Sequence, residues 1–455
     1  GRFMQEEGRI NGAFWLVKAL RRLGVGYIFV LSGNGLRPFL LSCQSEGLRV
    51  IDCHNEQSAS YMADTWGRMT RRLGVVAVSS GPGHTNALTG VANAFWDGSP
   101  LMLISGSSSE QTRGLDHFQE LDQVAMVAPI CKYAARVTDS HQFPHQFRRA
   151  LLAAVSGRPG PVHLTIPEDI FNEEVSAEAL RYLSNFRPVM ATVSPLGEAE
   201  EELVAEAAQM IKNAAQPLIL VGSSLFYAQG GDVLGEFARR TDIPILSSIW
   251  ERGAIESPLP QYVGVSDPWG EAGPAFRFLA ESDLLISIGA RLDYRVGYLA
   301  PPICSPELKV IHIDHDPGEV YRTQIPHLGL VGNCATVLQQ IMGHLPDTPS
   351  PVHTAWLRRI VEHRERTLAK WLPFASDSSV PLRSIRICSE LAPIIKDENT
   401  IFLLDGGNIG RWAHLWLFDR HPGRWLTCGA SGVVGYGIPG AIAAKLAFPD
   451  KRVLL

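Results

Sequence analysis

The sequence predicts an α/β protein made of three doubly wound domains with mostly parallel sheets. Short, fully apolar segments such as Tyr27–Leu31 and Leu101–Gly106 alternate with segments of helical periodicity. This alternation is typical of parallel sheets that are covered by helices on both faces. The length of 455 residues corresponds to about three domains at roughly 150 residues each.

The composition excludes several classes of protein. Hydrophobic residues make up 45% and charged residues 19%, and the formal net charge of −5 argues against a strongly basic nucleic-acid binder. No apolar run reaches about 18 residues, so we expect neither a transmembrane helix nor a membrane partner. Seven cysteines without a C-x-x-C pair argue against a disulfide scaffold or a zinc ribbon, and they favour a reducing, cytoplasmic location.

The first predicted domain covers residues 8–172. Helical periodicity predicts helices over 10–23, 56–69 and 84–95, and apolar runs predict strands over 27–31, 49–53, 75–80 and 101–106. Residues 157–169 have the pattern of a turn, a strand and a turn. The stretch 171–194 shows no periodicity, so we expect a linker there.

The second and third predicted domains cover 195–345 and 380–455. In the second, a helix is expected over 200–213 and strands over 217–222, 243–248, 284–289 and 310–314. A linker with one charged helix, 346–379, leads to a third domain with helices over 382–395 and 438–447 and strands over 401–404 and 452–455. The last strand has the composition of a buried strand, so we expect this third domain to be truncated and the polypeptide to continue past Leu455.

Two glycine-containing turns and one glutamate are the first candidates for a functional site. Ser32–Gly35 and Ser80–Gly83 follow predicted strands, where ligands of parallel sheets bind. Glu56 lies between a strand and a helix of small residues; a structural role as a carboxylate favoured by the helix dipole is the alternative. Neither turn is a phosphate-binding P-loop, and no G-x-G-x-x-G dinucleotide fingerprint is present.

The order of these and further motifs resembles the thiamine-diphosphate (ThDP) enzymes, most closely their acetolactate synthase branch. The motifs are Glu56 before a helix, Ser80-Gly-Pro-Gly83, Phe118-Gln119-Glu120, Gly157-Arg-Pro-Gly-Pro161, Gly289–Arg295, Val310–Pro317 and Leu426–Gly437. The resemblance covers nearly the whole chain. It implies that the three predicted domains are the pyrimidine-binding, central and pyrophosphate-binding domains of that family.

The resemblance implies a role for each candidate residue. Glu56 would hydrogen-bond N1′ of the aminopyrimidine, so that the cofactor's own imino group removes the proton from the thiazolium C2. Phe118, Gln119 and Lys132 would face the substrate, although a solvated surface lysine is an equal alternative for Lys132. Further cofactor contacts would come from Gly33, Ser80, Gly81, Pro82, Asn86, Gly407 and Asn408, from the carbonyl of Gly432, and from Val434 as the apolar wedge that bends the cofactor.

The resemblance also implies further cofactors and a partner. Arg291, Asp293, Arg295 and Asp314 resemble the FAD-binding segment of acetolactate synthases, where FAD has a structural role. Glu251, however, stands where relatives have a glycine, and a carboxylate there would repel a flavin phosphate. No metal ligand is assigned within the chain, because relatives place their Mg²⁺ ligands after the final strand, beyond Leu455. A homodimer or tetramer with active sites at the interface is expected.

These features predict a ThDP-dependent carboligase that decarboxylates a 2-oxo acid such as pyruvate and joins the acyl carbanion to a second carbonyl compound. The first alternative is a ThDP-dependent C–C lyase similar to benzaldehyde lyase or the 2-hydroxyacyl lyases. Residues 121–129 resemble benzaldehyde lyase, but Gly35 stands where that enzyme has its catalytic histidine. The second alternative is a catalytically silent homologue that keeps the fold.

Overall fold

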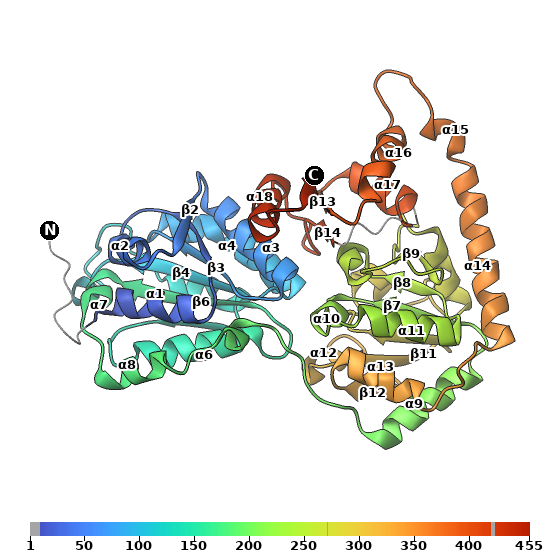
Figure 1. Cartoon of the computed structure of the whole chain (residues 1–455), viewed down its shortest axis with the longest axis horizontal. Helices are drawn as coiled ribbons and strands as arrows, with labels where there is room; N and C mark the ends of the chain where they lie inside the picture. Colours follow the sequence, from blue (N-terminus) through green and yellow to red (C-terminus); the bar gives the residue numbers. More distant parts are fainter. Residues whose placement is uncertain (1–9, 271, 420–423) are drawn as a thin grey trace. The chain divides into compact units, whose positions relative to one another are not determined.

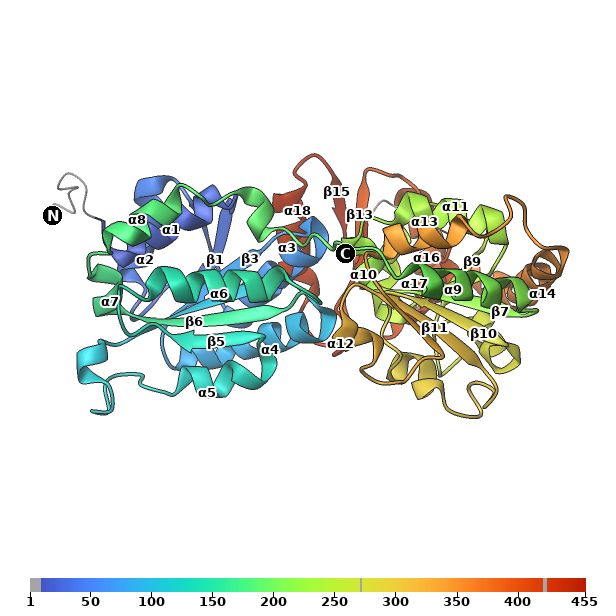
Figure 2. The same ribbon diagram turned by 90° about the horizontal axis from the view of Figure 1, so that it is seen from below.

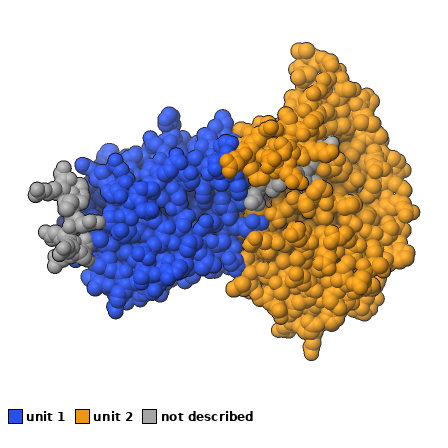
Figure 3. All heavy atoms as spheres, viewed as in Figure 1, with its two compact units in different colours: residues 1–194, 430–449 blue, residues 195–429, 450–455 orange. Residues whose placement is uncertain are grey.

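The computed structural model describes residues 10–270, 272–419 and 424–455 (Figure 1). The chain divides into two compact units, which Figure 3 distinguishes by colour. Unit 1 comprises residues 1–194 and 430–449, and unit 2 comprises residues 195–429 and 450–455. Unit 1 therefore takes a short segment from near the end of the sequence in addition to the first predicted domain.

Unit 1 contains a six-stranded, fully parallel sheet with the strand order β2-β1-β3-β4-β6-β5. The strands are β1 (Tyr27–Leu31), β2 (Arg49–Asp52), β3 (Gly74–Val78), β4 (Leu101–Ser107), β5 (Tyr133–Arg136) and β6 (Pro161–Pro167). The side chains of β3, β4 and β6 are buried throughout, because helices cover both faces of the sheet.

The helices of unit 1 form two layers. They are α1 (Gly12–Arg22), α2 (Arg37–Glu46), α3 (Glu56–Thr70), α4 (Pro82–Asp97), α5 (Gln123–Val127), α6 (Phe143–Val155), α7 (Glu168–Asn172), α8 (Ala177–Leu183) and α18 (Gly437–Ala447). One core joins α1, α2, α6, α7 and α8 to one face of the sheet, and a second joins α3, α4, α5 and α18 to the other. In Figure 2, α1 and α8 lie on one side of the strands and α4 and α5 on the other.

Unit 2 contains a second six-stranded parallel sheet with the order β12-β11-β10-β7-β8-β9. Its strands are β7 (Pro217–Val221), β8 (Ile245–Ser247), β9 (Tyr262–Val265), β10 (Leu284–Ile288), β11 (Lys309–Asp314) and β12 (Leu328–Val331). One core packs α9 (Glu201–Asn213), α11 (Gly231–Thr241) and α13 (Cys334–Met342) against one face of the sheet. The other face is covered by the 3₁₀ segment η5 (Pro274–Glu281) and by α14 (Pro351–Ala369).

A small third sheet, also parallel, lies in unit 2 with the order β14-β13-β15. It consists of β13 (Thr400–Leu404), β14 (Arg424–Thr427) and β15 (Arg452–Leu454), and α16 (Ser384–Ile395) and α17 (Asn408–Trp416) pack on it. Three parallel sheets covered by helices confirm the predicted fold class. No described helix is long and apolar enough to cross a membrane.

Two sequence-based predictions about local structure were wrong. The stretch 171–194, predicted as a linker, contains α8 and a 3₁₀ turn over Pro188–Ala191, and Ala179 and Leu183 are buried in the first core of unit 1. Helix α8 is too short to show a clear periodicity, and its place depends on packing rather than on pattern. The last strand, predicted as buried, is partly exposed in β15.

Three buried histidines make the stability of the protein depend on pH. Burial lowers the pKa of His84 to about 4 and that of His414 to about 3, and it holds the pKa of His163 well below its usual range. The unfolded chain therefore binds more protons than the folded one below the ordinary histidine pKa of 6.5. We predict that the free energy of unfolding falls as the pH is lowered from about 6.5 towards 4, by about 1.4 kcal/mol per pH unit for each histidine.

Urea denaturation at several pH values between 7 and 4 measures this slope. The variant His414→Phe provides the comparison, because both ring nitrogens of His414 are buried without a hydrogen-bond partner among the described residues. In the variant, the free energy of unfolding should fall less steeply with decreasing pH, by about 1.4 kcal/mol per pH unit, which is the contribution of one histidine. If His414→Phe leaves the slope unchanged, His414 takes up a proton as readily in the folded protein as in the unfolded chain, which contradicts the lowered pKa.

Candidate functional site

The candidate residues of unit 1 gather where β1, β2 and β3 end. Gly33 follows β1, Glu56 follows β2 as the first residue of α3, and Ser80 follows β3 just before α4. Because the strands are parallel and neighbouring, these three turns lie at one edge of the sheet. This is the edge at which open parallel sheets bind ligands.

Glu56 is a buried carboxylate with one amide partner. Glu56 is 7% exposed, and the Asn86 side chain on α4 donates a hydrogen bond to Glu56 Oε2 over 3.1 Å. Asn55 caps α3 by accepting a hydrogen bond from the Gln57 amide, which orients the first turn. The other carboxylate oxygen, Oε1, faces the backbone of Gly83: a Cβ atom there would lie 3.3 Å from it.

The contact between Glu56 and Asn86 depends on the close packing of α3 and α4. A Cβ atom on Gly90 in α4 would lie only 2.3 Å from the Cβ of Ser60 in α3. The small residues predicted beside Glu56 thus allow the two helices to approach. Their close approach brings the carboxylate and the amide together.

A chain of side-chain hydrogen bonds connects the Ser80 turn to the loop before α5. Asn34 donates to the Ser80 hydroxyl over 2.8 Å, and this hydroxyl donates to Gln119 Oε1 over 3.1 Å. The amide of Gly81 donates to Gln123, whose side chain is 3% exposed and also donates to Gly106 and Thr165. The loop that carries Gln119 is thereby attached to the edge of the sheet.

Residues 430–436 reach the same region from near the end of the sequence. The Val434 carbonyl accepts hydrogen bonds from Tyr61, over 3.2 Å, and from Gln57, over 3.4 Å, both on α3. The Val434 side chain is 80% exposed, and Gly432 beside it is also exposed. The structure therefore brings the Gly432–Val434 turn to the helix that begins with Glu56.

Buried charges hold this segment in place. Arg68 on α3 lies 3.0 Å from Asp64 and 3.5 Å from Asp97, and its guanidinium stacks on the ring of Tyr436. Burial disfavours the charge of Arg68, but Asp64, Tyr436 and Asp97 raise its pKa above the usual range. Asp97 also accepts a hydrogen bond from the Ala430 amide, so the cation and its partners join α3, α4 and the 430–436 segment.

These residues fit the thiamine diphosphate that the resemblance implies. A buried carboxylate suits a heterocyclic nitrogen that shares its proton, and the lack of a side chain at Gly83 lets the Ser79 hydroxyl lie close to this turn beside Oε1. The exposed Val434 offers an apolar surface next to α3, the helix that begins with Glu56. Among the described residues, no three histidine, cysteine or acidic side chains gather in a way that could hold a metal ion.

Four further candidates belong to other elements of the chain. Lys132 precedes β5 and so lies at the opposite, amino-terminal edge of the sheet, where its ammonium donates to the carbonyls of Ser156 and Arg158. Phe118 is 69% exposed, and its carbonyl accepts from Ser108. Gly407 and Asn408 follow β13 in unit 2, where both are exposed, and their part in a cofactor site remains a prediction.

The candidates for FAD binding lie at the carboxyl edge of the second sheet and are already paired with carboxylates. Arg291 donates to Glu319 over 2.7 and 2.9 Å, and Arg295 donates to Asp293 over 3.0 and 2.9 Å. Asp314 accepts from Ser224 over 2.9 Å. With both guanidinium groups occupied, these residues do not fit a flavin diphosphate.

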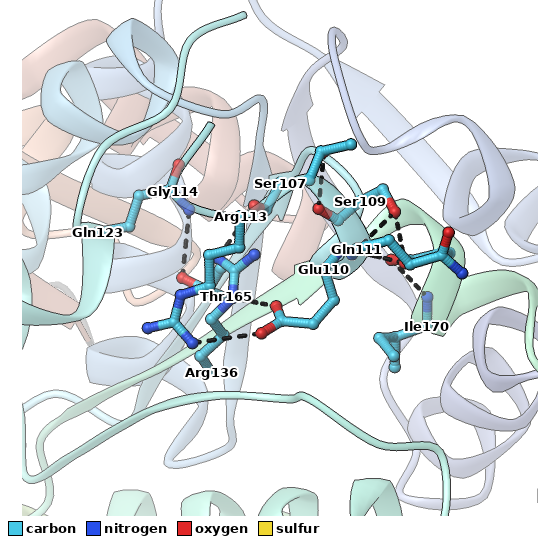
Figure 4. Close-up of polar contacts among 12 residues, drawn as sticks. Ser107, Ser109, Glu110, Gln111, Arg113, Gly114, Gln123, Arg136, Thr165 and Ile170 are labelled. Atoms are coloured by element: carbon cyan, nitrogen blue, oxygen red, sulfur yellow. Dashed lines mark hydrogen bonds and ion pairs between the residues drawn. The ribbon is translucent and has the colours of Figure 1, made fainter. Parts of the chain in front are cut away.

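A cavity of about 710 Å³ lies near the carboxyl ends of β5 and β6, in the half of the unit 1 sheet that does not carry Glu56. Arg113, Arg136, Gln123 and Thr165 contribute to its lining (Figure 4). Glu110 accepts from Arg136 over 2.6 Å and from Arg113 over 3.2 Å, as the dashed lines in Figure 4 indicate. Gln123 lines the cavity and also holds the Gly81 turn, so the two parts of the edge are connected.

Several residues of the site were not found by sequence reasoning. They are Asn34, Gln57, Tyr61 and Gln123. The position of Asn34 between two glycines in a turn after a strand was a usable signal. Nothing local marked Tyr61 or Gln123, because their partners lie 373 and 42 residues away in the sequence.

Comparisons with known proteins cover all three sheets. Residues 10–126 match the family model described as "Thiamine pyrophosphate enzyme, N-terminal TPP binding domain", residues 204–341 match the central domain, and residues 405–455 match the C-terminal TPP binding domain. The chain is 33% identical to an acetolactate synthase large subunit of Parasynechococcus marenigrum over 98% of this chain and 71% of that one. It is 31% identical to the large subunit of acetolactate synthase isozyme 2 of Escherichia coli (98% and 77%) and 28% identical to human 2-hydroxyacyl-CoA lyase 1 (98% and 75%).

The close contact of α3 and α4 yields a test of the site's geometry. We predict that Gly90→Ala forces the helices apart, lowers the free energy of unfolding by about 1–3 kcal/mol and weakens the cofactor site. Urea denaturation measures the loss, and Gly26→Ala is the matched control because nothing lies within 4 Å of its added Cβ. Equal stability of the two variants would contradict the role of this contact.

Proposed function

This chain belongs to the thiamine pyrophosphate enzyme family, and on that premise we propose that it is a carboligase similar to acetolactate synthase. It would decarboxylate a 2-oxo acid such as pyruvate and join the acyl unit to a second carbonyl compound. The names of relatives at about 30% identity over nearly the whole chain support this reading.

The observation that carries the proposal is the buried carboxylate of Glu56 beside Asn86 and Gly83. When bound, thiamine diphosphate supplies the electron sink for breaking a carbon–carbon bond next to a carbonyl group. Glu56 would share a proton with the pyrimidine nitrogen at Oε1, because Oε2 is held by Asn86. The burial of Glu56 would exclude water from this hydrogen bond and so strengthen it.

The remaining residues of the site would position the cofactor and admit the substrate. The Gly432–Val434 turn, held by Tyr61, would contact the pyrimidine ring, while Gly33, Ser80, Gly81 and Pro82 would shape the neighbouring edge. We place Phe118 and Gln119 on the substrate side, because Gln119 is bonded to Ser80 and its loop borders the cavity of unit 1. We leave Lys132 out of the catalytic group, since it lies at the opposite edge of the sheet.

A lyase is the second candidate, favoured by the similarity to human 2-hydroxyacyl-CoA lyase 1. The backbone at Gly35 weighs against a mechanism like that of benzaldehyde lyase. Its φ is +82°, and an added Cβ would lie 2.5 Å from the Ser107 amide nitrogen, so a histidine does not fit there. Cleavage of a 2-hydroxy ketone without release of CO₂ would identify a lyase, whereas CO₂ release from a 2-oxo acid followed by coupling would identify a carboligase.

A variant of Glu56 tests the carboligase and lyase proposals together against the alternative of a catalytically silent homologue. We predict that Glu56→Gln lowers the turnover of pyruvate or a related 2-oxo acid by about 10²-fold or more, because the amide cannot hold the shared proton. Steady-state CO₂ release measures turnover, and fluorescence titration measures cofactor binding. The control is Glu178→Gln on the exposed face of α8, which should keep the wild-type rate. Equal rates for Glu56→Gln and wild type would remove Glu56 from the mechanism.

We further propose that the enzyme works as a homodimer or tetramer in the cytoplasm, with Mg²⁺ bound to the cofactor's diphosphate. An exposed apolar stripe on unit 1 supports the association: Val434, Ile438 and Ile442 are 80%, 69% and 43% exposed, and Ile438 and Ile442 are one helical turn apart on α18. All seven cysteines are free thiols, which suits a reducing compartment.

The stripe can be tested by introducing a charge. We predict that Ile438→Glu dissociates the oligomer, because an unpaired carboxylate would be buried at the interface. Light scattering of the purified protein measures the mass, with Leu196→Glu as the control, since Leu196 is 83% exposed and lies outside the stripe. An unchanged oligomer in Ile438→Glu would place the interface elsewhere.

A further inference from the structure

The order of strands in the central sheet marks one place for a ligand. Strands β7, β8 and β9 follow one another on one side of the sheet, and β10, β11 and β12 follow one another on the other. The direction of winding therefore changes between β7 and β10, and the carboxyl ends of these two strands border the crevice where such folds bind nucleotides. The turns at this point are Gly222, directly after β7, and Gly289-Ala290, directly after β10.

The carboxylate of Glu251 lies at this crevice. A Cβ atom on Gly222 would lie 2.7 Å from Glu251 Oε2 and 2.5 Å from the Ala290 Cα. The Glu251 side chain is 8% exposed, and its Oε2 accepts no hydrogen bond from a described residue. The backbone turn that faces a phosphate in nucleotide-binding sheets thus faces a protein carboxylate here.

Glu251 also pairs with Arg295, the cation that a bound phosphate would need as its counterion. Its Oε2 is 3.6 Å from Nη1 of Arg295, a side chain that is 1% exposed and also binds Asp293 through two hydrogen bonds. Burial disfavours the charge of Arg295, but Glu251 and Asp293 raise its pKa above the usual range. The second guanidinium at this edge, Arg291, is held by both oxygens of Glu319. Neither arginine offers an anion an unshared charge.

We propose that Glu251 is a built-in anion that occupies the phosphate position of the central crevice, so that this unit excludes FAD and other dinucleotides and keeps its fold without one. A dinucleotide would have to bring its diphosphate against a buried carboxylate with no counterion to spare, which is strongly unfavourable at low dielectric. This inference concerns unit 2 and is independent of the activity proposed for Glu56.

Binding of FAD to the purified protein tests the exclusion. The wild-type protein should show no flavin absorbance as isolated and no saturable quenching of FAD fluorescence. Glu251→Gly removes the carboxylate from the crevice and leaves Arg295 with Asp293 as its remaining acidic partner among those described, so the variant should gain FAD affinity, roughly tenfold or more. Inorganic phosphate should raise the melting temperature of the Glu251→Gly variant and leave that of the wild-type protein unchanged.

Two further variants make the result specific. Glu251→Gln keeps the size of the side chain but removes its charge, so it serves if the glycine variant does not fold, and it should bind FAD more tightly than the wild type. Glu256→Gly is the matched control, because Glu256 also lies against a glycine, but against Gly231 at the start of α11 and not against Gly222; it should bind no FAD. Saturable FAD binding by the wild type would overturn the proposal. So would Glu251 variants that bind FAD and phosphate no better than the wild type.

Discussion

The close approach of helices α3 and α4 is the constraint on which the site depends. Gly90 and Ser60 allow the two helices to touch, and this contact places Glu56 at the start of one helix beside Asn86 in the other. The same pair of helices carries Asp64, Arg68, Asn93 and Asp97, whose buried contacts hold residues 430–436. The carboxylate, its amide partner and the Val434 turn are thus positioned by one packing contact and one buried charge network.

The two large sheets use the same edge in opposite ways. At the edge of unit 1, Glu56 is buried and its Oε1 lies beside the Gly83 turn, and Val434 is exposed next to the helix that Glu56 begins. At the edge of unit 2, the acidic and basic side chains pair with one another, and Gly222 is in contact with a carboxylate. A shared fold therefore does not imply a shared ligand, because the side chains at each edge decide what it binds.

The sequence alone supported much of the fold, for a physical reason. Strands buried on both faces are continuous apolar runs, so β1, β7 and β10 were located almost to the residue. Glu56, Ser80 and Gln119 could be named as candidates because their motifs are local. The helix α8 was missed because it is short, and Tyr61 and Gln123 were missed because their roles depend on partners that are distant in the sequence. Lys132 was named from a motif alone, and its position on the other edge of the sheet required the topology.

The central claim is that Glu56 promotes removal of the proton from C2 of bound thiamine diphosphate. The most direct measurement is the rate at which that proton exchanges for deuterium in the protein–cofactor complex, followed by quenched-flow NMR without any substrate. If Glu56 acts as described, exchange should be fast in the wild type and slower by about 10²-fold or more in Glu56→Gln at full cofactor occupancy. Equal exchange rates in the two proteins would contradict the assignment and leave Glu56 with a structural role at the start of α3.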